Sequence, residues 1–223
     1  MGLLEIFRGG KPEAPAIGLS EVYDASIKDL PDSRIPAHDQ ALAKAIQDYV
    51  TDENANVKYN QIFRFEEAWH REPDFYLSYY WIATYNMDRK NYQQAIEVLK
   101  DGIAKSLVKS PLCRRLAECY FWSGDVERAI YWFCTAIMAG DQTDYNVYLY
   151  LGYIFEAYGL KKASYWARRR GRGISYQMTY VAIEYMKRDI DRITDMVNRH
   201  KNEHSRRMLE AFYPFAKKTL GYL

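Results

Sequence analysis

The fold is decided by residues 113–120, which read CRRLAECY, and by residues 125–130 behind them, which read DVERAI. The same pattern stands 34 residues earlier, where residues 79–86 read YYWIATYN and residues 91–96 read NYQQAI. Repetition at this fixed period is typical of arrays of helical hairpins, in which each unit packs on its neighbours. The usual work of such an array is to bind another polymer rather than to catalyse a reaction.

From residue 37 onward, each long segment predicts a helix. Apolar residues recur at intervals of three and four, as in an amphipathic helix, and the alternation that marks a strand is absent. Glycine and proline fall mainly where helices would end. The predicted helices span residues 37–50, 56–71, 74–88, 92–105, 111–123, 126–139, 145–158, 161–170, 175–200 and 203–220. Pro214 should kink or interrupt the last of them, because proline lacks the amide donor that a helix uses.

The first 36 residues differ from the rest, because prolines and glycines punctuate them. We expect a flexible N-terminal arm over residues 1–36 with one short helix near residues 20–30, capped by Ser20 and stopped by Pro31. The repeats are then expected over residues 37–178 and C-terminal capping helices over residues 179–223, in one continuous domain.

Residues 116–136 resemble the tetratricopeptide repeat. Small and aromatic residues stand where that family has them, with a turn between the helices: Leu116, Ala117, Tyr120, Gly124, Asp125, Ala129, Phe133 and Ala136. The resemblance covers roughly residues 37–176. It implies an all-α fold of antiparallel helical hairpins stacked in a right-handed superhelix, closed by a C-terminal capping helix pair that covers an otherwise exposed apolar face.

The repeat pattern depends on small residues at the contacts between helices. Two antiparallel helices approach closely only where facing side chains are small, while bulky residues fill the gap to the next hairpin. We expect the small role for Ala83, Ala95, Ala117, Ala129 and Gly152.

The pattern weakens toward the C-terminal end. Leu151 and Gly152 fit the first helix of a further repeat, but its second helix has Ser164 at the small site and Arg168 where an aromatic residue is usual. The spacing from the previous repeat is 35 residues, so one residue is inserted in the connection 138–144. The repeat therefore fails where a basic cluster begins.

Composition favours a globular intracellular chain. Of the 223 residues, 48% are apolar, which argues against disorder and allows one large or two small domains. No stretch approaches the roughly 18 apolar residues that span a bilayer, and the N-terminus lacks the features of a signal peptide. The three cysteines, Cys113, Cys119 and Cys134, are therefore expected to be reduced thiols in a cytoplasmic protein.

Motifs for catalysis are absent from the sequence. It contains no GxSxG, P-loop, GxGxxG or HExxH pattern. The best metal candidate is the pair His200 and His204 with Glu203 between them, but Arg199 and Arg206 bring positive charge to this segment. We expect a protein that is not an enzyme and holds neither a metal nor a cofactor.

The family resemblance implies a binding groove. In tetratricopeptide arrays the first helix of each hairpin lines a concave surface, and its outward residues contact the ligand. Carried onto this chain, the groove residues are Tyr80, Thr84, Met87, Arg114, Glu118, Phe121, Trp122, Leu149 and Tyr153. The expected lining is aromatic and mildly acidic, and for Tyr80 and Phe121 the sequence leaves groove and core equally open. Such a groove suits a protein or peptide partner that buries side chains in pockets.

A basic patch offers a second candidate surface. Residues 161–223 carry 15 Lys and Arg against 6 Asp and Glu, so they bear +9 and the first 160 residues bear −7. The patch consists of Arg168, Arg169, Arg170 and Arg172, with aromatic residues on both sides. Consecutive arginines point in different directions on a helix, and we expect Arg168 to pack its stem along the hairpin.

The basic patch leaves several partners open. Arginines interleaved with aromatic residues can bind phosphates and stack on single-stranded bases. An acidic protein, self-association with the acidic front of the chain, or a solvated helix face fits the charge as well. We therefore expect a protein-interaction module, acting as adaptor, scaffold or chaperone, with a nucleic-acid-binding helical repeat as the alternative.

Overall fold

The computed structural model describes residues 45, 48, 55–139, 145–174 and 190–221. All regular secondary structure within these ranges is helical. The helices are α4 (Ala55–Arg71), α5 (Tyr76–Asp88), α6 (Tyr92–Lys105), α7 (Ser110–Ser123), α8 (Val126–Met138), α9 (Tyr145–Ala157), α10 (Lys161–Ile174) and α12 (Glu203–Leu220). Residues 190–200 are also helical. The prediction of an all-helical chain is confirmed for this part of the sequence.

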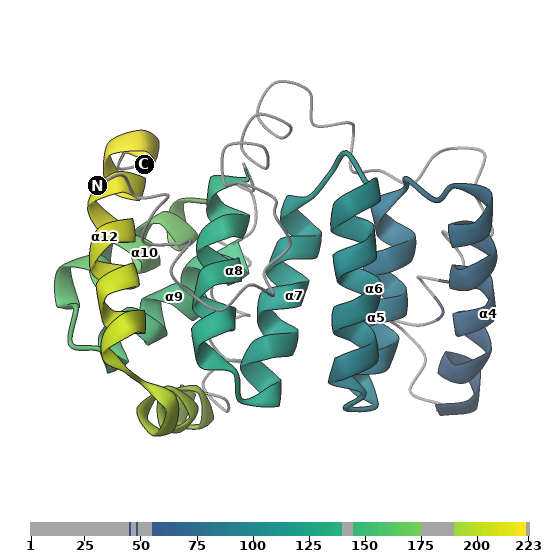
Figure 1. Ribbon diagram of the computed structural model, residues 1–223, viewed down its shortest axis with the longest axis horizontal. Coiled ribbons are helices and arrows are strands. Elements are labelled where there is room, and N and C mark those ends of the chain that lie inside the picture. Colours follow the sequence, from purple (N-terminus) through teal and green to yellow (C-terminus); the bar gives the residue numbers. More distant parts are fainter. Residues whose placement is uncertain (1–44, 46–47, 49–54, 140–144, 175–189, 222–223) are drawn as a thin grey trace.

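Consecutive helices pack side by side, as a helical repeat requires. The pairs α5 with α6, α7 with α8, and α9 with α10 form hairpins, and α5 also contacts α7, the first helix of the next hairpin. Figure 1 shows the helices in sequence order from α4 (blue) to α10 (green), with α12 (yellow) at the far end. This helical-repeat-like arrangement is compatible with a tetratricopeptide fold.

Most predicted helix boundaries agree with the structure within two residues, and α6 matches the prediction at both ends. Helix α10 is longer than predicted, because it continues through Gly171 to Ile174 instead of ending at Arg170. Gly171 is buried, and tertiary packing of this kind overrides the helix penalty of about 1 kcal/mol that glycine carries.

Pro214 was predicted to kink or interrupt the last helix, and the interruption is wrong, because α12 runs from Glu203 to Leu220 with Pro214 inside it. A proline inside a helix frees the carbonyl four residues earlier, which here belongs to Glu210. Both Pro214 and Glu210 are exposed, so water can hydrogen-bond to the freed carbonyl and the helix continues.

Several predicted elements lie outside the described residues. These are the N-terminal arm 1–36, all but Ala45 and Asp48 of the helix predicted over 37–50, residues 140–144 of the connection with the inserted residue, and residues 175–189 of the first capping helix.

The small sites of the repeat lie in the core. Ala83, Ala95, Ala117 and Ala129 have no exposed surface, which agrees with close helix contacts at these positions. A further close contact joins Gly102 of α6 to Tyr79 of α5, since a Cβ atom at Gly102 would lie 2.6 Å from Cγ of Tyr79. The first hairpin therefore depends on a glycine that the repeat pattern did not single out.

The turn between α7 and α8 combines two local signals. Gly124 has a φ of +95°, a conformation that favours glycine, and ends α7. The side chain of Asp125 then accepts a hydrogen bond from the amide of Arg128 at 3.0 Å and caps α8. The sequence Gly124-Asp125 thus fixes the hairpin that carries the clearest repeat.

Two core clusters hold the array together. The larger one runs from α5 to α12 and includes Ile193 and Val197 of the helical segment 190–200. The smaller one joins Ala45 to α4 and to Ile82 and Tyr85 on α5. Among the described helices, none is both long and apolar enough to cross a membrane.

Candidate functional site

A cavity of about 290 Å³ opens where α5, α7 and α9 meet the helical segment 190–200. Residues from all four elements line it: Tyr80, Met87, Arg114, Arg115, Glu118, Trp122, Asn146, Tyr150 and Ile193. The first helices of three successive hairpins therefore contribute to one cavity.

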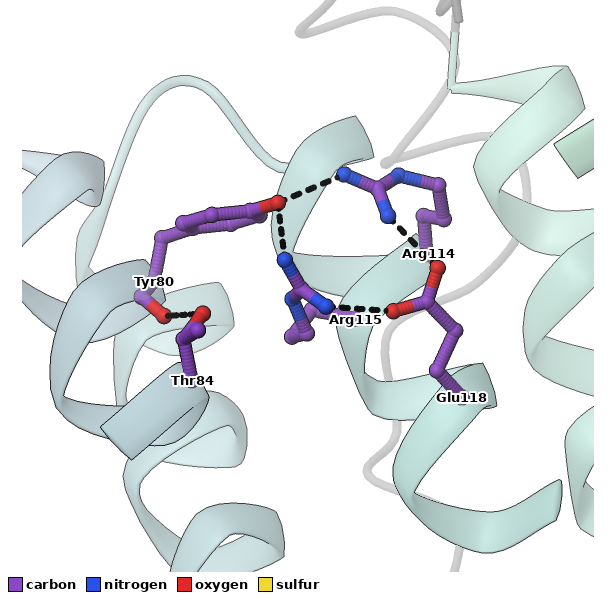
Figure 2. A network of polar contacts seen from close by, with 5 residues as sticks. All are labelled: Tyr80, Thr84, Arg114, Arg115 and Glu118. Atoms are coloured by element: carbon purple, nitrogen blue, oxygen red, sulfur yellow. Dashed lines mark hydrogen bonds and ion pairs between the residues drawn. The ribbon is translucent and has the colours of Figure 1, made fainter. Parts of the chain in front are cut away.

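A polar network connects α5 to α7 along one wall of the cavity (Figure 2). The hydroxyl of Tyr80 accepts a hydrogen bond from Nη2 of Arg114 at 2.8 Å and another from Nη2 of Arg115. Nη1 of Arg114 and Nη1 of Arg115 bind the two carboxylate oxygens of Glu118, at 2.6 and 2.7 Å. One tyrosine and one glutamate thus hold two arginines side by side.

The network places two positive charges against one negative charge in a poorly solvated place. The side chains of Arg114, Arg115 and Glu118 are 10%, 18% and 7% exposed. Burial alone would raise the pKa of Glu118, but the charges of Arg114 and Arg115 and their hydrogen bonds hold that pKa below its ordinary value. The carboxylate stays ionised at neutral pH, and the network keeps a net charge of +1.

Aromatic rings form another wall of the cavity. The ring of Tyr150 stacks on Phe133 at a centroid distance of 4.9 Å and meets Trp122 edge-on at 6.4 Å. Burial, followed by the negative charge of Glu118, raises the pKa of the Tyr150 hydroxyl, so this tyrosine stays neutral. The cavity therefore combines a cationic wall with an aromatic one.

The segment 190–200 supplies a third side. Ile193 lines the cavity, and the guanidinium of the exposed Arg192 lies 4.6 Å from the ring of Trp122. A further positive charge therefore stands beside the aromatic wall. The expectation of a mildly acidic lining is wrong for this cavity, whose charged residues are mainly arginines.

The structure separates the predicted groove residues into four groups. Five of them line the cavity: Tyr80, Met87, Arg114, Glu118 and Trp122. Thr84 lies one turn along α5, where its hydroxyl donates to the carbonyl of Tyr80 at 2.8 Å (Figure 2). Phe121 and Leu149 are buried in the core, at 0% and 3% exposed. Tyr153 lies at a different place, against Arg168.

Four cavity residues do not belong to that set of nine groove residues: Arg115, Asn146, Tyr150 and Ile193. Arg115 and Tyr150 stand at the same repeat position, 35 residues apart, one place after Arg114 and Leu149. Following that neighbouring position along the repeats would have found both. Ile193 lies beyond the repeats, and no period in the sequence points to it.

The predicted basic patch divides between the core and the surface. Arg170 is 2% exposed, and its Nη1 donates to the carbonyls of Leu220 at 2.5 Å and Gly221 at 3.2 Å. Its guanidinium also lies 5.6 Å from the ring centroid of Tyr148. Arg170 therefore fastens the end of α12 to α10, and the expectation that it belongs to an exposed patch is wrong.

Arg168 packs along the hairpin, as expected. A Cβ atom at Gly152 would lie 2.9 Å from Cγ of Arg168, so the missing side chain of Gly152 leaves space for the arginine stem. The Arg168 guanidinium lies 4.7 Å from the ring centroid of Tyr153 and forms an ion pair with Glu156. Unlike Arg168, Arg169 and Arg172 are largely exposed.

A second cavity, of about 460 Å³, lies beside the exposed arginines. Its lining comes from α10 and from the end of α9: Glu156, Lys161, Ser164, Tyr165, Arg168, Arg169 and Arg172. It shares no residue with the first cavity.

His200 and His204 do not lie on one helix, as the metal candidate would require. Lys201 and Asn202 separate the helix that ends at His200 from α12, which carries His204. His204 instead lies 3.9 Å from the carboxylate of Glu127 on α8. Among the described residues, no group of three or more His, Cys, Asp or Glu side chains is arranged to hold a metal ion.

The fold and the cavity define a helical-repeat-like protein with a cationic and aromatic recess between the first helices of three successive hairpins. No family model, curated protein or solved structure matches this chain.

Proposed function

We propose that this chain is a cytoplasmic protein-interaction module of the tetratricopeptide type, which binds a segment of a protein partner at the first cavity. In this proposal the hairpins follow a right-handed superhelix, and the C-terminal helices cap the stack. One observation carries the proposal: the first helices of three successive hairpins meet around one recess. Repeat arrays bind their ligands across such shared inner surfaces.

The side chains around the cavity indicate the chemistry of the bound segment. Arg114 and Arg115 outweigh Glu118 by one charge, and Arg192 stands near the rim, so a carboxylate side chain is the favoured guest. Met87 and Trp122 offer apolar contact beside the arginines. We therefore propose that the partner presents an Asp or Glu next to an apolar residue.

A peptide-display experiment tests this proposal. Random peptides are selected on the intact protein, and enriched peptides are measured by fluorescence anisotropy. We expect enrichment of acidic residues beside apolar ones. Trp122→Ala removes one ring of the aromatic wall and Met87→Glu adds a repelling carboxylate, so each should weaken binding about tenfold or more.

Two controls make the result decisive. Tyr165→Ala alters the second cavity only and should leave peptide affinity unchanged, and circular dichroism checks that each variant is folded. Peptides without an acidic preference, or with equal affinity for the wild type and both cavity variants, would contradict the proposal.

A further inference from the structure

One side of α10 presents positive charge to solvent. Lys161, Tyr165, Arg168, Arg169 and Arg172 follow the spacing of a helix face, since residues three, four and seven apart lie on one side of a helix. We call these five residues the α10 face. All of them line the second cavity.

The opposite side of α10 packs into the core and leaves the α10 face outward. Trp166 and Ala167 are fully buried, and Arg170 turns inward to the carbonyls at the end of α12. Glu156 is the one acidic residue among those that line the second cavity, and it pairs with Arg168. The cavity therefore has four cations against one carboxylate.

An exposed aromatic ring stands among these cations. Tyr165 is 64% exposed, and it lies one turn from Lys161 on one side and about one turn from Arg168 and Arg169 on the other. The Arg168 guanidinium is held in place by Tyr153 and Glu156. The face thus offers a tyrosine ring and an anchored guanidinium as flat surfaces, with the exposed cations Lys161, Arg169 and Arg172 around them.

We propose that the α10 face binds single-stranded nucleic acid. The phosphates would pair with Lys161, Arg169 and Arg172, and a base would stack on Tyr165 and enter the adjoining recess. Base stacking on aromatic rings within a cationic track is the usual mode of sequence-tolerant single-strand binding. The ring of Tyr165 is 64% exposed among these cations, so its open face can stack on a base, and this favours a nucleic acid over an acidic protein.

The dimensions agree with a short stretch of one strand. From Lys161 to Arg172 the helix rises about 17 Å, at about 1.5 Å per residue. This length matches about five phosphates at the spacing of about 3.4 Å along one stacked strand. The volume of the recess, about 460 Å³, lies within the range of pockets that hold small molecules. The α10 face is separate from the protein-binding cavity, so this inference does not depend on the proposed function.

A salt titration of the intact protein tests the inference. The probe is a fluorescent single-stranded oligouridylate of about 12 nucleotides, measured by anisotropy between about 50 and 200 mM salt. We expect affinity to fall as salt rises. The triple variant Lys161→Gln, Arg169→Gln and Arg172→Gln should bind more than tenfold more weakly, with a log–log salt slope smaller by about 2, at roughly 0.7 for each lost contact.

The aromatic contact has its own variant. Tyr165→Ala should weaken binding about tenfold or more through lost stacking, with the salt slope unchanged because no charge is removed. Phe215→Ala, which removes a partly exposed ring from α12, is the matched control and should bind like the wild type. These two variants separate stacking from general charge attraction.

A second triple variant controls for net charge. Arg199→Gln, Arg207→Gln and Lys218→Gln remove the same charge from exposed sites elsewhere and should keep at least half of the affinity. Absence of binding at low salt, or an equal loss in both triple variants, would overturn the inference. Polyglutamate binding that is lost in the first triple, with no effect of Tyr165→Ala on the RNA, would overturn it in favour of an acidic protein partner.

Discussion

The hydroxyl of Tyr80 accepts a hydrogen bond from Nη2 of Arg114 at 2.8 Å, and the two residues are separated by 34 positions, one full repeat. The two residues that share this hydrogen bond therefore occupy the same repeat position in two successive hairpins. Repeat proteins gain stability from the contacts between neighbouring units. In this chain such a contact is polar and also forms a wall of the candidate binding cavity.

Removing the Tyr80 hydroxyl should weaken the joint between the first two hairpins. Tyr80→Phe keeps the ring but leaves Arg114 and Arg115 without a shared acceptor. We expect the free energy of unfolding to fall by about 1.5 kcal/mol, the scale of a hydrogen bond to a charged group, measured by urea denaturation. Tyr165→Phe, at an exposed ring, should change stability by less than about 0.5 kcal/mol.

Acid should destabilise the same network through Glu118. Its pKa is held below the ordinary value of about 4.3 in the folded protein. Its contribution to stability is therefore complete above that value and is lost as pH falls through the lower folded pKa. Near neutral pH, Glu118→Gln should cost about 3–5 kcal/mol, because it leaves two buried arginines poorly compensated.

The pH dependence of that cost separates Glu118 from other carboxylates. The difference in the free energy of unfolding between the wild type and Glu118→Gln should narrow as pH falls below about 4. Urea denaturation at each pH measures this difference. Glu67→Gln, at an exposed site, should show a small gap at every pH. A Glu118→Gln gap that stays constant down to about pH 3 would rule out a lowered pKa for Glu118.

Arg170 should matter more for stability than its exposed neighbours. Arg170→Met keeps a long stem but removes the donor to the carbonyl of Leu220 and leaves the carbonyl of Gly221 with the indole N–H of Trp166 at 3.3 Å. We expect a loss of about 2 kcal/mol together with faster hydrogen exchange in the last turn of α12. Arg172→Met should stay within about 0.5 kcal/mol of the wild type, and an equal effect of the two variants would contradict the buried role of Arg170.

Gly102 should not tolerate alanine, although alanine favours helices. The new Cβ would lie 2.6 Å from Cγ of Tyr79, and overpacking of this kind costs about 1–3 kcal/mol against a gain of about 1 kcal/mol in helix propensity. We expect Gly102→Ala to destabilise the protein in thermal unfolding. In a Tyr79→Gly background, which also removes the Tyr79 Cβ atom that would lie 2.8 Å from the new methyl group, the same change should be neutral or stabilising, and a cost that persists there would exclude the clash as its cause.

The repeat pattern predicted the helices well because it depends on local rules. The period, the turn glycines and the small contact sites can all be recognised within about 34 residues of sequence. Both ends of α6 were predicted correctly. Five of the cavity residues followed from the same pattern. The inward direction of Arg170 could also have been predicted. Each helical residue turns by about 100°, so Arg170 lies on the opposite side of the helix from Arg168 and Arg172.

The parts that sequence reasoning missed depend on contacts between distant segments. Ile193 reaches the cavity only because the segment 190–200 packs across the ends of earlier helices, and no repeat encodes that contact. Leu149 was assigned to the groove by position but is only 3% exposed, and Phe121, for which the sequence left groove and core open, is fully buried. Continuous α12 likewise depends on the solvent exposure of Pro214 and Glu210, which a local rule for proline does not include.

Arg170 and Leu220 are in contact although they lie 50 residues apart in the sequence. This contact changes how the C-terminal end of the array can open. A linear array of repeats can open one unit at a time from a terminus, because each unit is held by a single neighbour. Here α12 packs on α8 while its last carbonyls are held from α10. The last hairpin, α9 with α10, is thus held on both sides and must separate together with its neighbours. The C-terminal end therefore behaves like an internal unit of the array.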